Sequence, residues 1–152
     1  MEFKTIEDIL KFAISKERAS VQFYKDLALQ MGDSTTRALF ETLVQNEEKH
    51  IALLELEINK LGHTLIIEET ASADYLWEER LELDDEARHM DFIDALLLAI
   101  QKERAAFRLY TQMLGSIQNE PFAKVFIDLA EEEMRHVLQL EREYEAVTHR
   151  KD

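Results

Sequence analysis

The second half of this sequence repeats the first half at a fixed spacing of 86 residues. The tetrapeptide KERA occurs at positions 16–19 and again at positions 102–105. The same shift aligns further identical pairs without a gap, and five of them lie at positions central to the prediction. These five pairs are Tyr24 with Tyr110, Phe40 with Phe126, Leu43 with Leu129, Glu47 with Glu133, and His50 with His136. Because such a repeat marks one supersecondary unit that is used more than once, the sequence predicts two copies of one helical hairpin.

Turn-forming residues divide each half into two helices. The chain contains only three Gly and one Pro, which favours long uninterrupted helices. Breaks at 32–34, Gly62, Gly115 and Pro121 place the helices at about 5–31, 34–61, 91–114 and 120–147, with a long crossover at about 63–90. Two tight hairpins joined by one long crossover are typical of a ferritin-like four-helix bundle. We therefore predict an all-α fold in a single domain spanning residues 1–152.

The composition restricts the function and the partners. The net charge is −14 with neutral histidines, so nucleic acid and anionic lipid surfaces should repel the chain. No apolar run approaches the roughly 18 residues that a membrane span needs, and the N-terminal residues lack the features of a signal peptide. The absence of cysteine excludes disulfides and thiolate metal ligands. We expect a cytoplasmic protein that binds neither nucleic acid nor membrane.

Each predicted helix carries an apolar stripe that an acidic residue interrupts near its middle. The stripes follow the three- and four-residue spacing of a helix face that is buried in a core. In the second and fourth helices a histidine follows the acid three positions later, on the same face. The six interrupting residues are Glu17, Glu47, His50, Glu103, Glu133 and His136. We expect antiparallel packing to bring them together inside the bundle.

The charge of these residues predicts a metal site. A buried ionised carboxylate without a partner costs several kcal/mol, and the stripes contain no lysine or arginine. Two divalent cations would balance the four carboxylates. Carboxylate and imidazole ligands without sulfur suit iron, manganese or zinc. A single Glu-x-x-His motif is most often a surface feature, but here it occurs twice at equivalent positions. We predict two bound metal ions, with iron as the expected metal and manganese or zinc as alternatives.

The glutamates and histidines together resemble the rubrerythrin-like branch of the ferritin-like di-iron carboxylate proteins. The resemblance covers both hairpins and implies that Glu47 and Glu133 bridge two irons. It further implies that Glu17 and Glu103 are terminal ligands, and that each of the two histidines supplies one nitrogen.

The resemblance also assigns a role to the repeated tyrosines. Tyr24 and Tyr110 resemble tyrosines that lie beside the ligands in this family, and we predict that they assist catalysis. The alternative is that they fill the core, with their hydroxyl groups on buried acceptors. Both interpretations hold together without conflict.

Two positions depart from the related families. Rubrerythrins have an additional glutamate one turn after the ligand of the third helix, and here that position is Ala106. Its absence argues against efficient peroxidase cycling of the rubrerythrin type. Bacterioferritins have a haem-binding methionine after the first bridging glutamate. The corresponding residue here is Glu48, so we expect no haem.

The leading functional interpretation is an oxidoreductase that reduces peroxide or dioxygen with electrons from an external donor. One alternative is a ferroxidase or iron-handling protein that forms no storage cage. Another is a structural bundle that its metal ions stabilise. A second apolar face on the first and third helices, which includes Phe12, Phe23, Leu98 and Leu109, is either covered by the crossover or buried between subunits. We expect a homodimer.

Overall fold

The structure is a computed structural model, and it describes residues 3–61, 91–117 and 120–149. These residues form four α-helices: α1 (Ile6–Gln30), α2 (Ser34–Leu61), α3 (Phe92–Leu114) and α4 (Glu120–His149). Every boundary lies within two residues of the position expected from the sequence. The predicted crossover at 63–90 lies outside the described residues. The predicted all-α four-helix fold is confirmed.

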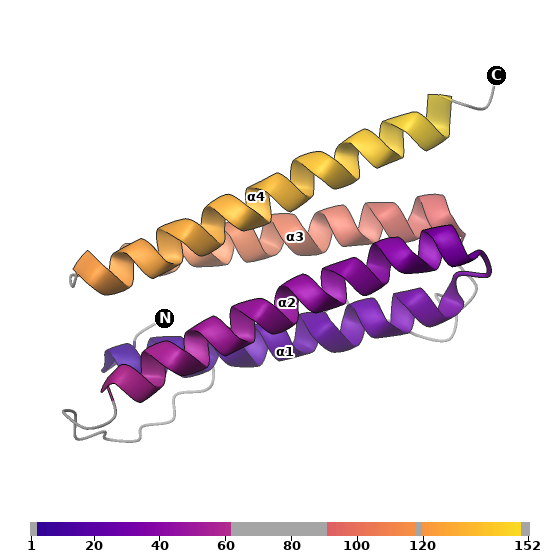
Figure 1. Cartoon of the computed structure of the whole chain (residues 1–152). Coiled ribbons are helices and arrows are strands. Elements are labelled where there is room, and N and C mark those ends of the chain that lie inside the picture. The colour runs from indigo at the N-terminus through magenta and orange to yellow at the C-terminus, as the bar shows by residue number, and fades with distance from the viewer. Residues whose placement is uncertain (1–2, 62–90, 118–119, 150–152) are drawn as a thin grey trace.

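The four helices form two antiparallel hairpins that lie side by side. Figure 1 shows α1 packed along α2, and α3 packed along α4, with all four axes nearly aligned. The end of α2 and the beginning of α3 lie at opposite ends of the bundle (Figure 1). In consequence α2 and α3 run in the same direction, while α1 is antiparallel to α3. This up-down-down-up order is the one that a ferritin-like bundle with one crossover requires.

Side-chain caps fix where the helices begin. The Thr5 hydroxyl accepts a hydrogen bond from the backbone N–H of Asp8 at 3.0 Å, and the Asp8 carboxylate accepts one from the Thr5 N–H at 3.2 Å. At the start of α3 the Asp91 carboxylate accepts from the Asp94 N–H at 2.9 Å. A cap of this kind stabilises a helix by about 1 kcal/mol, which sets the register of the apolar face that follows.

Buried apolar side chains fill the two ends of the bundle and leave its middle polar. One cluster includes Leu27, Phe40, Leu96 and Leu140. The other includes Leu10, Leu54, Met113 and Phe126. Burying one such side chain contributes roughly 1.5–3 kcal/mol, so the two clusters hold both hairpins together and cover the region between them.

The sequence repeat is also a structural repeat. Tyr24 and Tyr110, which are 86 positions apart, are both fully buried in the core. On the surface Arg18 forms an ion pair with Glu55 at 2.9 Å, and the equivalent residues of the second hairpin form the same pair. Exposed pairs of this kind contribute at most about 1 kcal/mol. Their value here is that they show the two hairpins to be built alike.

The second apolar face is partly covered within the chain. Phe23 and Leu109 are buried, while Phe12 and Leu98 are partly buried. This leaves less apolar surface for a subunit interface than the sequence pattern suggested, and the homodimer stays a prediction. Each helix in the described part of the chain pairs an apolar face with a charged one, and none is long and apolar enough to cross a bilayer.

Candidate metal centre

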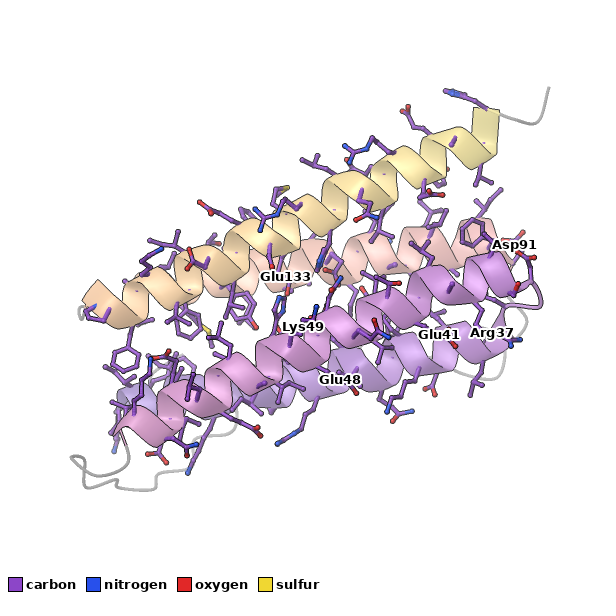
Figure 2. The ribbon with its side chains drawn as sticks, viewed as in Figure 1. Arg37, Glu41, Glu48, Lys49, Asp91 and Glu133 are labelled. Atoms are coloured by element: carbon purple, nitrogen blue, oxygen red, sulfur yellow. The ribbon has the colours of Figure 1, made fainter. Side chains whose placement is uncertain are left out.

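The six residues that interrupt the apolar stripes lie together in the middle of the bundle. α1 and α3 each contribute one glutamate, and α2 and α4 each contribute a glutamate and a histidine one turn apart. None of the six is more than 8% exposed. Figure 2 labels Glu133, whose side chain projects from α4 toward the first hairpin. The six residues that the helical spacing in the sequence singled out are therefore the ones that the fold brings together.

The six residues form two groups that share two members. In each group the potential ligand atoms lie within 4.8 Å of one another. The first group is Glu17, Glu47, His50 and Glu133, and the second is Glu47, Glu103, Glu133 and His136. Because Glu47 and Glu133 belong to both groups, they are placed to contact two neighbouring ions, whereas each remaining residue faces only one.

The atoms of the first group are spaced like ligands around one ion. His50 Nδ1 lies 3.2 Å from Glu47 Oε1, 3.4 Å from Glu17 Oε2 and 3.5 Å from Glu133 Oε2. Two ligand atoms on one ion, with bonds near 2.1 Å and angles between octahedral and tetrahedral, are about 3.0–3.4 Å apart. The observed separations match that range closely.

The second group repeats this arrangement around the other histidine. His136 Nδ1 lies 2.9 Å from Glu103 Oε1 and 3.5 Å from Glu133 Oε1. One oxygen of Glu133 therefore faces each histidine. This division of a carboxylate between two groups is the geometry that a bridging ligand needs.

Unpartnered polar atoms gather at this centre. Buried atoms without a hydrogen bond include His50 Nδ1, one oxygen each of Glu17 and Glu47, and both oxygens of Glu133. Buried polar atoms are nearly always paired in folded proteins, so these atoms indicate a missing partner. A cation satisfies lone pairs of this kind, and the all-oxygen-and-nitrogen donor set fits divalent iron, manganese or zinc.

The carboxyl groups shared by both groups hold their protons strongly in the metal-free protein. Burial raises the pKa of Glu47 and of Glu133 well above its usual range, and the Glu103 carboxylate raises both further. Burial also raises the pKa of Glu103, but its hydrogen bonds with His136 and Glu133 and the charge of His136 together outweigh burial and lower the pKa to about 2. Negative charge in the metal-free centre therefore lies on Glu103, beside His136.

The two histidines carry the compensating charge. Burial lowers the pKa of His50, but its contacts with Glu133 and Glu17 outweigh burial and raise the pKa to about 11. Burial also lowers the pKa of His136, but its contacts, chiefly with Glu103, outweigh burial and raise the pKa to about 9. Protons thus occupy this centre in the absence of metal, and a bound cation must displace them.

Two tyrosine hydroxyls cross from one hairpin to the other at the ends of the centre. Tyr24 on α1 donates to Glu103 Oε2 at 2.6 Å, and Tyr110 on α3 donates to Glu17 Oε2. Burial, followed by the charge of the contacted glutamate, raises the pKa of both phenols well above the usual value. The tyrosines therefore remain neutral hydrogen-bond donors, and their predicted catalytic role stays a prediction.

The outer nitrogens of the two histidines have partners that the sequence analysis missed. His50 Nε2 lies 2.6 Å from Glu132 Oε1, and His136 Nε2 lies 3.3 Å from Asn46 Nδ2. Both partners come from the opposite hairpin and immediately precede a predicted ligand. The available signal was that Asn46 and Glu132 are themselves 86 residues apart. Groups in this position orient a metal-binding histidine and tune its basicity.

A small cavity opens beside the centre, between α1 and α3. Its volume is about 90 Å³, and its walls include Glu17, Tyr110, Ala106 and the stems of Lys16 and Lys102. The cavity thus reaches two members of the polar network directly. Ala106 contributes only a small side chain to this wall.

Comparisons with known proteins agree with this structure. The family model described as Rubrerythrin matches residues 94–152. Nothing among the curated proteins gave a significant match. A solved structure of an uncharacterized conserved protein from Magnetospirillum magnetotacticum is 23% identical, with a TM-score of 0.76, and the match covers 94% of this chain and 95% of that one. A hypothetical protein from Pyrococcus furiosus is 22% identical, with a TM-score of 0.67, over 97% of this chain and 93% of that one.

The two solved structures establish the likeness of the fold over nearly the whole chain. The family match is more specific, because it covers the helices that carry Glu103, Glu133 and His136, and it indicates a di-iron protein of the ferritin-like class. The second hairpin of this chain therefore matches the rubrerythrin family, and the resemblance predicted from the sequence is confirmed.

Proposed function

We propose that this protein binds two iron ions in its core and reduces peroxide or dioxygen with electrons from an external donor. The observation that carries the proposal is the pair of four-residue groups that share Glu47 and Glu133. Their unpartnered oxygens supply the negative charge that two divalent ions require. The rubrerythrin match supports iron over manganese or zinc.

Each residue has a distinct part in holding the ions. Glu47 and Glu133 would contact both, Glu17 and His50 would complete one position, and the equivalent residues of the second hairpin would complete the other. When bound, two ferrous ions supply the two electrons that convert hydrogen peroxide and two protons into two waters. The proposal therefore requires an external donor of two electrons for each peroxide.

The protein residues around the centre control water and protons. The two apolar clusters cover the centre from both ends of the bundle, which strengthens electrostatic interactions inside it. Tyr24 donates a hydrogen bond from its hydroxyl group to Glu103, and Tyr110 donates one to Glu17. Their raised pKa values keep those protons in place until a stronger base forms nearby.

The cavity between α1 and α3 offers a small oxidant a route to the centre. Its volume is about 90 Å³, and one water molecule needs roughly 10–15 Å³ on the same measure. Hydrogen peroxide and dioxygen, which are close to water in size, fit such a space. Access through this cavity leads to Glu17 and Tyr110 rather than to the covered ends of the bundle.

An anaerobic iron titration tests the proposal. We expect metal-free protein to bind two ferrous ions per chain, and one peroxide to oxidise both. Glu47→Ala removes a shared ligand and should abolish pairwise binding. Glu48→Gln is the matched control, because it alters the neighbouring exposed carboxylate. Unchanged binding by Glu47→Ala, or absence of ferrous binding in the wild type, would contradict the proposed centre.

The same experiment separates the alternatives. Oxidation that stops after one turnover in the presence of reductant, followed by release of ferric iron to a chelator, would indicate iron handling. Size-exclusion chromatography then shows whether a storage cage forms. Binding of two ions that peroxide does not oxidise would indicate a structural role for the metal.

A further inference from the structure

The environments of the two histidines differ in charge, although the repeat makes the rest of the centre nearly symmetric. His50 contacts a carboxylate, Glu132 Oε1, at 2.6 Å through its outer nitrogen. His136 contacts an amide, Asn46 Nδ2, at 3.3 Å. Asn46 and Glu132 occupy equivalent positions of the repeat. The two hairpins therefore make the same contact to a histidine, one with an amide and the other with a carboxylate.

Hydrogen-bond polarity distinguishes the two contacts. A histidine that binds a metal through Nδ1 carries its proton on Nε2, so the group that faces Nε2 has to accept a hydrogen bond. The Glu132 carboxylate accepts in either orientation. His50 is therefore oriented for ligation, with Nδ1 directed at Glu17, Glu47 and Glu133.

His136 needs a rearrangement before it can bind in the same way. The NH₂ group of Asn46 faces His136 Nε2, and an NH₂ group donates only. At the same time His136 Nδ1 lies 2.9 Å from Glu103 Oε1, within hydrogen-bond distance. Ligation through Nδ1 requires the Asn46 amide to turn its oxygen toward the ring and requires this hydrogen bond to break.

The charge of Glu132 adds to this difference. Its carboxylate is 44% exposed and lies 3.8 Å from Arg135, so it is partly screened but remains an anion beside the ring. A carboxylate on the outer nitrogen makes an imidazole a more basic ligand, and loss of such a group typically lowers metal affinity by about 10–100-fold. Asn46 offers His136 a neutral partner.

We propose that the two metal positions are unequal, and that the position formed with His50 fills first because Glu132 orients and polarises that histidine. The inference rests on the proposed metal centre. It assigns Glu132 and Asn46 as positioning residues, and it predicts two resolved binding steps where the symmetric ligand set alone would give nearly equal ones.

Titration of metal-free protein with Mn²⁺ alone tests the inference. Calorimetry should resolve two steps whose affinities differ by about tenfold or more. At one equivalent, electron paramagnetic resonance should show chiefly isolated Mn²⁺, and at two equivalents chiefly coupled pairs. Equal affinities, with pairs forming from the first addition, would overturn the inference while leaving the metal centre intact. Absence of any binding would overturn the centre and the inference together.

Substitutions at the two positioning residues assign the steps. Glu132→Gln should weaken the first step by about tenfold and leave the second nearly unchanged, and Glu132→Asp should restore part of the loss. Asn46→Asp places a carboxylate beside His136 and should strengthen the second step. Glu131→Gln is the control, because it removes the same charge from an exposed neighbour. Equal effects of the substitutions at 131 and 132, or no effect of Asn46→Asp, would overturn the assignment.

Discussion

The hydroxyl of Tyr24 donates a 2.6 Å hydrogen bond to Glu103, a residue of the other hairpin. Tyr110 makes the reciprocal contact with Glu17. Each tyrosine thus joins the hairpin that carries it to a predicted ligand of the opposite hairpin. Both contacts are buried, where a hydrogen bond to a charged group contributes roughly 1.5–3 kcal/mol. The pair fixes Glu17 and Glu103 relative to each other before any metal binds.

Tyr24→Phe should therefore lower the free energy of unfolding of the metal-free protein by about 1–3 kcal/mol. It should retain two iron-binding sites but slow the oxidation of bound iron by peroxide, because Glu103 loses its proton donor. Urea unfolding and stopped-flow absorbance measure the two effects. Tyr144→Phe on α4 is the control. Oxidation rates that are equal in the two variants would show that Tyr24 only fills the core.

The stability of the metal-free protein should fall as the pH rises from about 6.5 to about 11. The folded-state pKa values of His136 and His50, about 9 and about 11, exceed the unfolded value of about 6.5. The folded protein then binds more protons than the unfolded chain. Their stabilisation is complete below about pH 6.5 and is lost as the pH rises through the folded values.

Each additional proton makes the free energy of unfolding fall by about 1 kcal/mol per pH unit in this window. Urea unfolding in the presence of a chelator, at several pH values, measures the slope. Replacement of His50 by Gln should flatten it, whereas Glu48→Gln should not. A free energy of unfolding that stays constant or increases over this window would contradict the protonated metal-free centre.

Glu47→Gln should raise the stability of the metal-free protein and abolish the stabilisation that metal provides. Burial raises the pKa of Glu47, so at pH 8 the folded protein has to hold a proton that the unfolded chain releases, and a neutral amide of similar shape avoids this cost. In the wild type, metal at 100 times the dissociation constant of a site should add about 2.7 kcal/mol for each site that it fills.

Thermal unfolding at pH 8, with and without Mn²⁺, measures both effects, and Glu48→Gln serves as the matched control. The two effects together identify a ligand. Replacing a residue with a purely structural role would not both stabilise the metal-free protein and abolish its stabilisation by metal. A variant that loses stability without metal, yet keeps the full metal-dependent shift, would count against Glu47 as a ligand.

Ala106→Leu should slow the reaction with peroxide without weakening metal binding. Ala106 lines the cavity of about 90 Å³ beside Glu17 and Tyr110, and three additional carbon atoms would occupy much of that space. Rapid-mixing oxidation of the iron-loaded protein measures the rate. Gln101→Leu, at an exposed position of the same helix, controls for added apolar surface. Unaltered oxidation in the Ala106 variant would place the entry route elsewhere.

Much of this centre could be predicted because helix periodicity is local. Glu47 and His50 share a helix face whatever the helix packs against, and the shift of 86 residues reproduces that pair at Glu133 and His136. The same periodicity placed Tyr24 and Tyr110 on buried faces. Burial of charged side chains at equivalent heights could be inferred from the stripes that they interrupt.

Contacts between hairpins could not be predicted in this way. Asn46 and Glu132 stand one position before the buried glutamates, in a place that is ordinarily solvated, and no periodicity marks them as partners of a histidine. Their contacts depend on how far one helix is rotated and shifted against another. The same holds for the cavity, whose walls combine residues of α1 and α3 that are far apart in the sequence.

The sequence by itself thus determined the four helices, their inward faces and the chemistry carried there, because each depends on residues within one or two turns of the same helix. Only the tertiary structure decided which glutamate each tyrosine contacts, how Glu47 and Glu133 are shared, and which histidine faces a carboxylate. Those relationships depend on the relative placement of four separate helices, and packing across their shared core sets that placement.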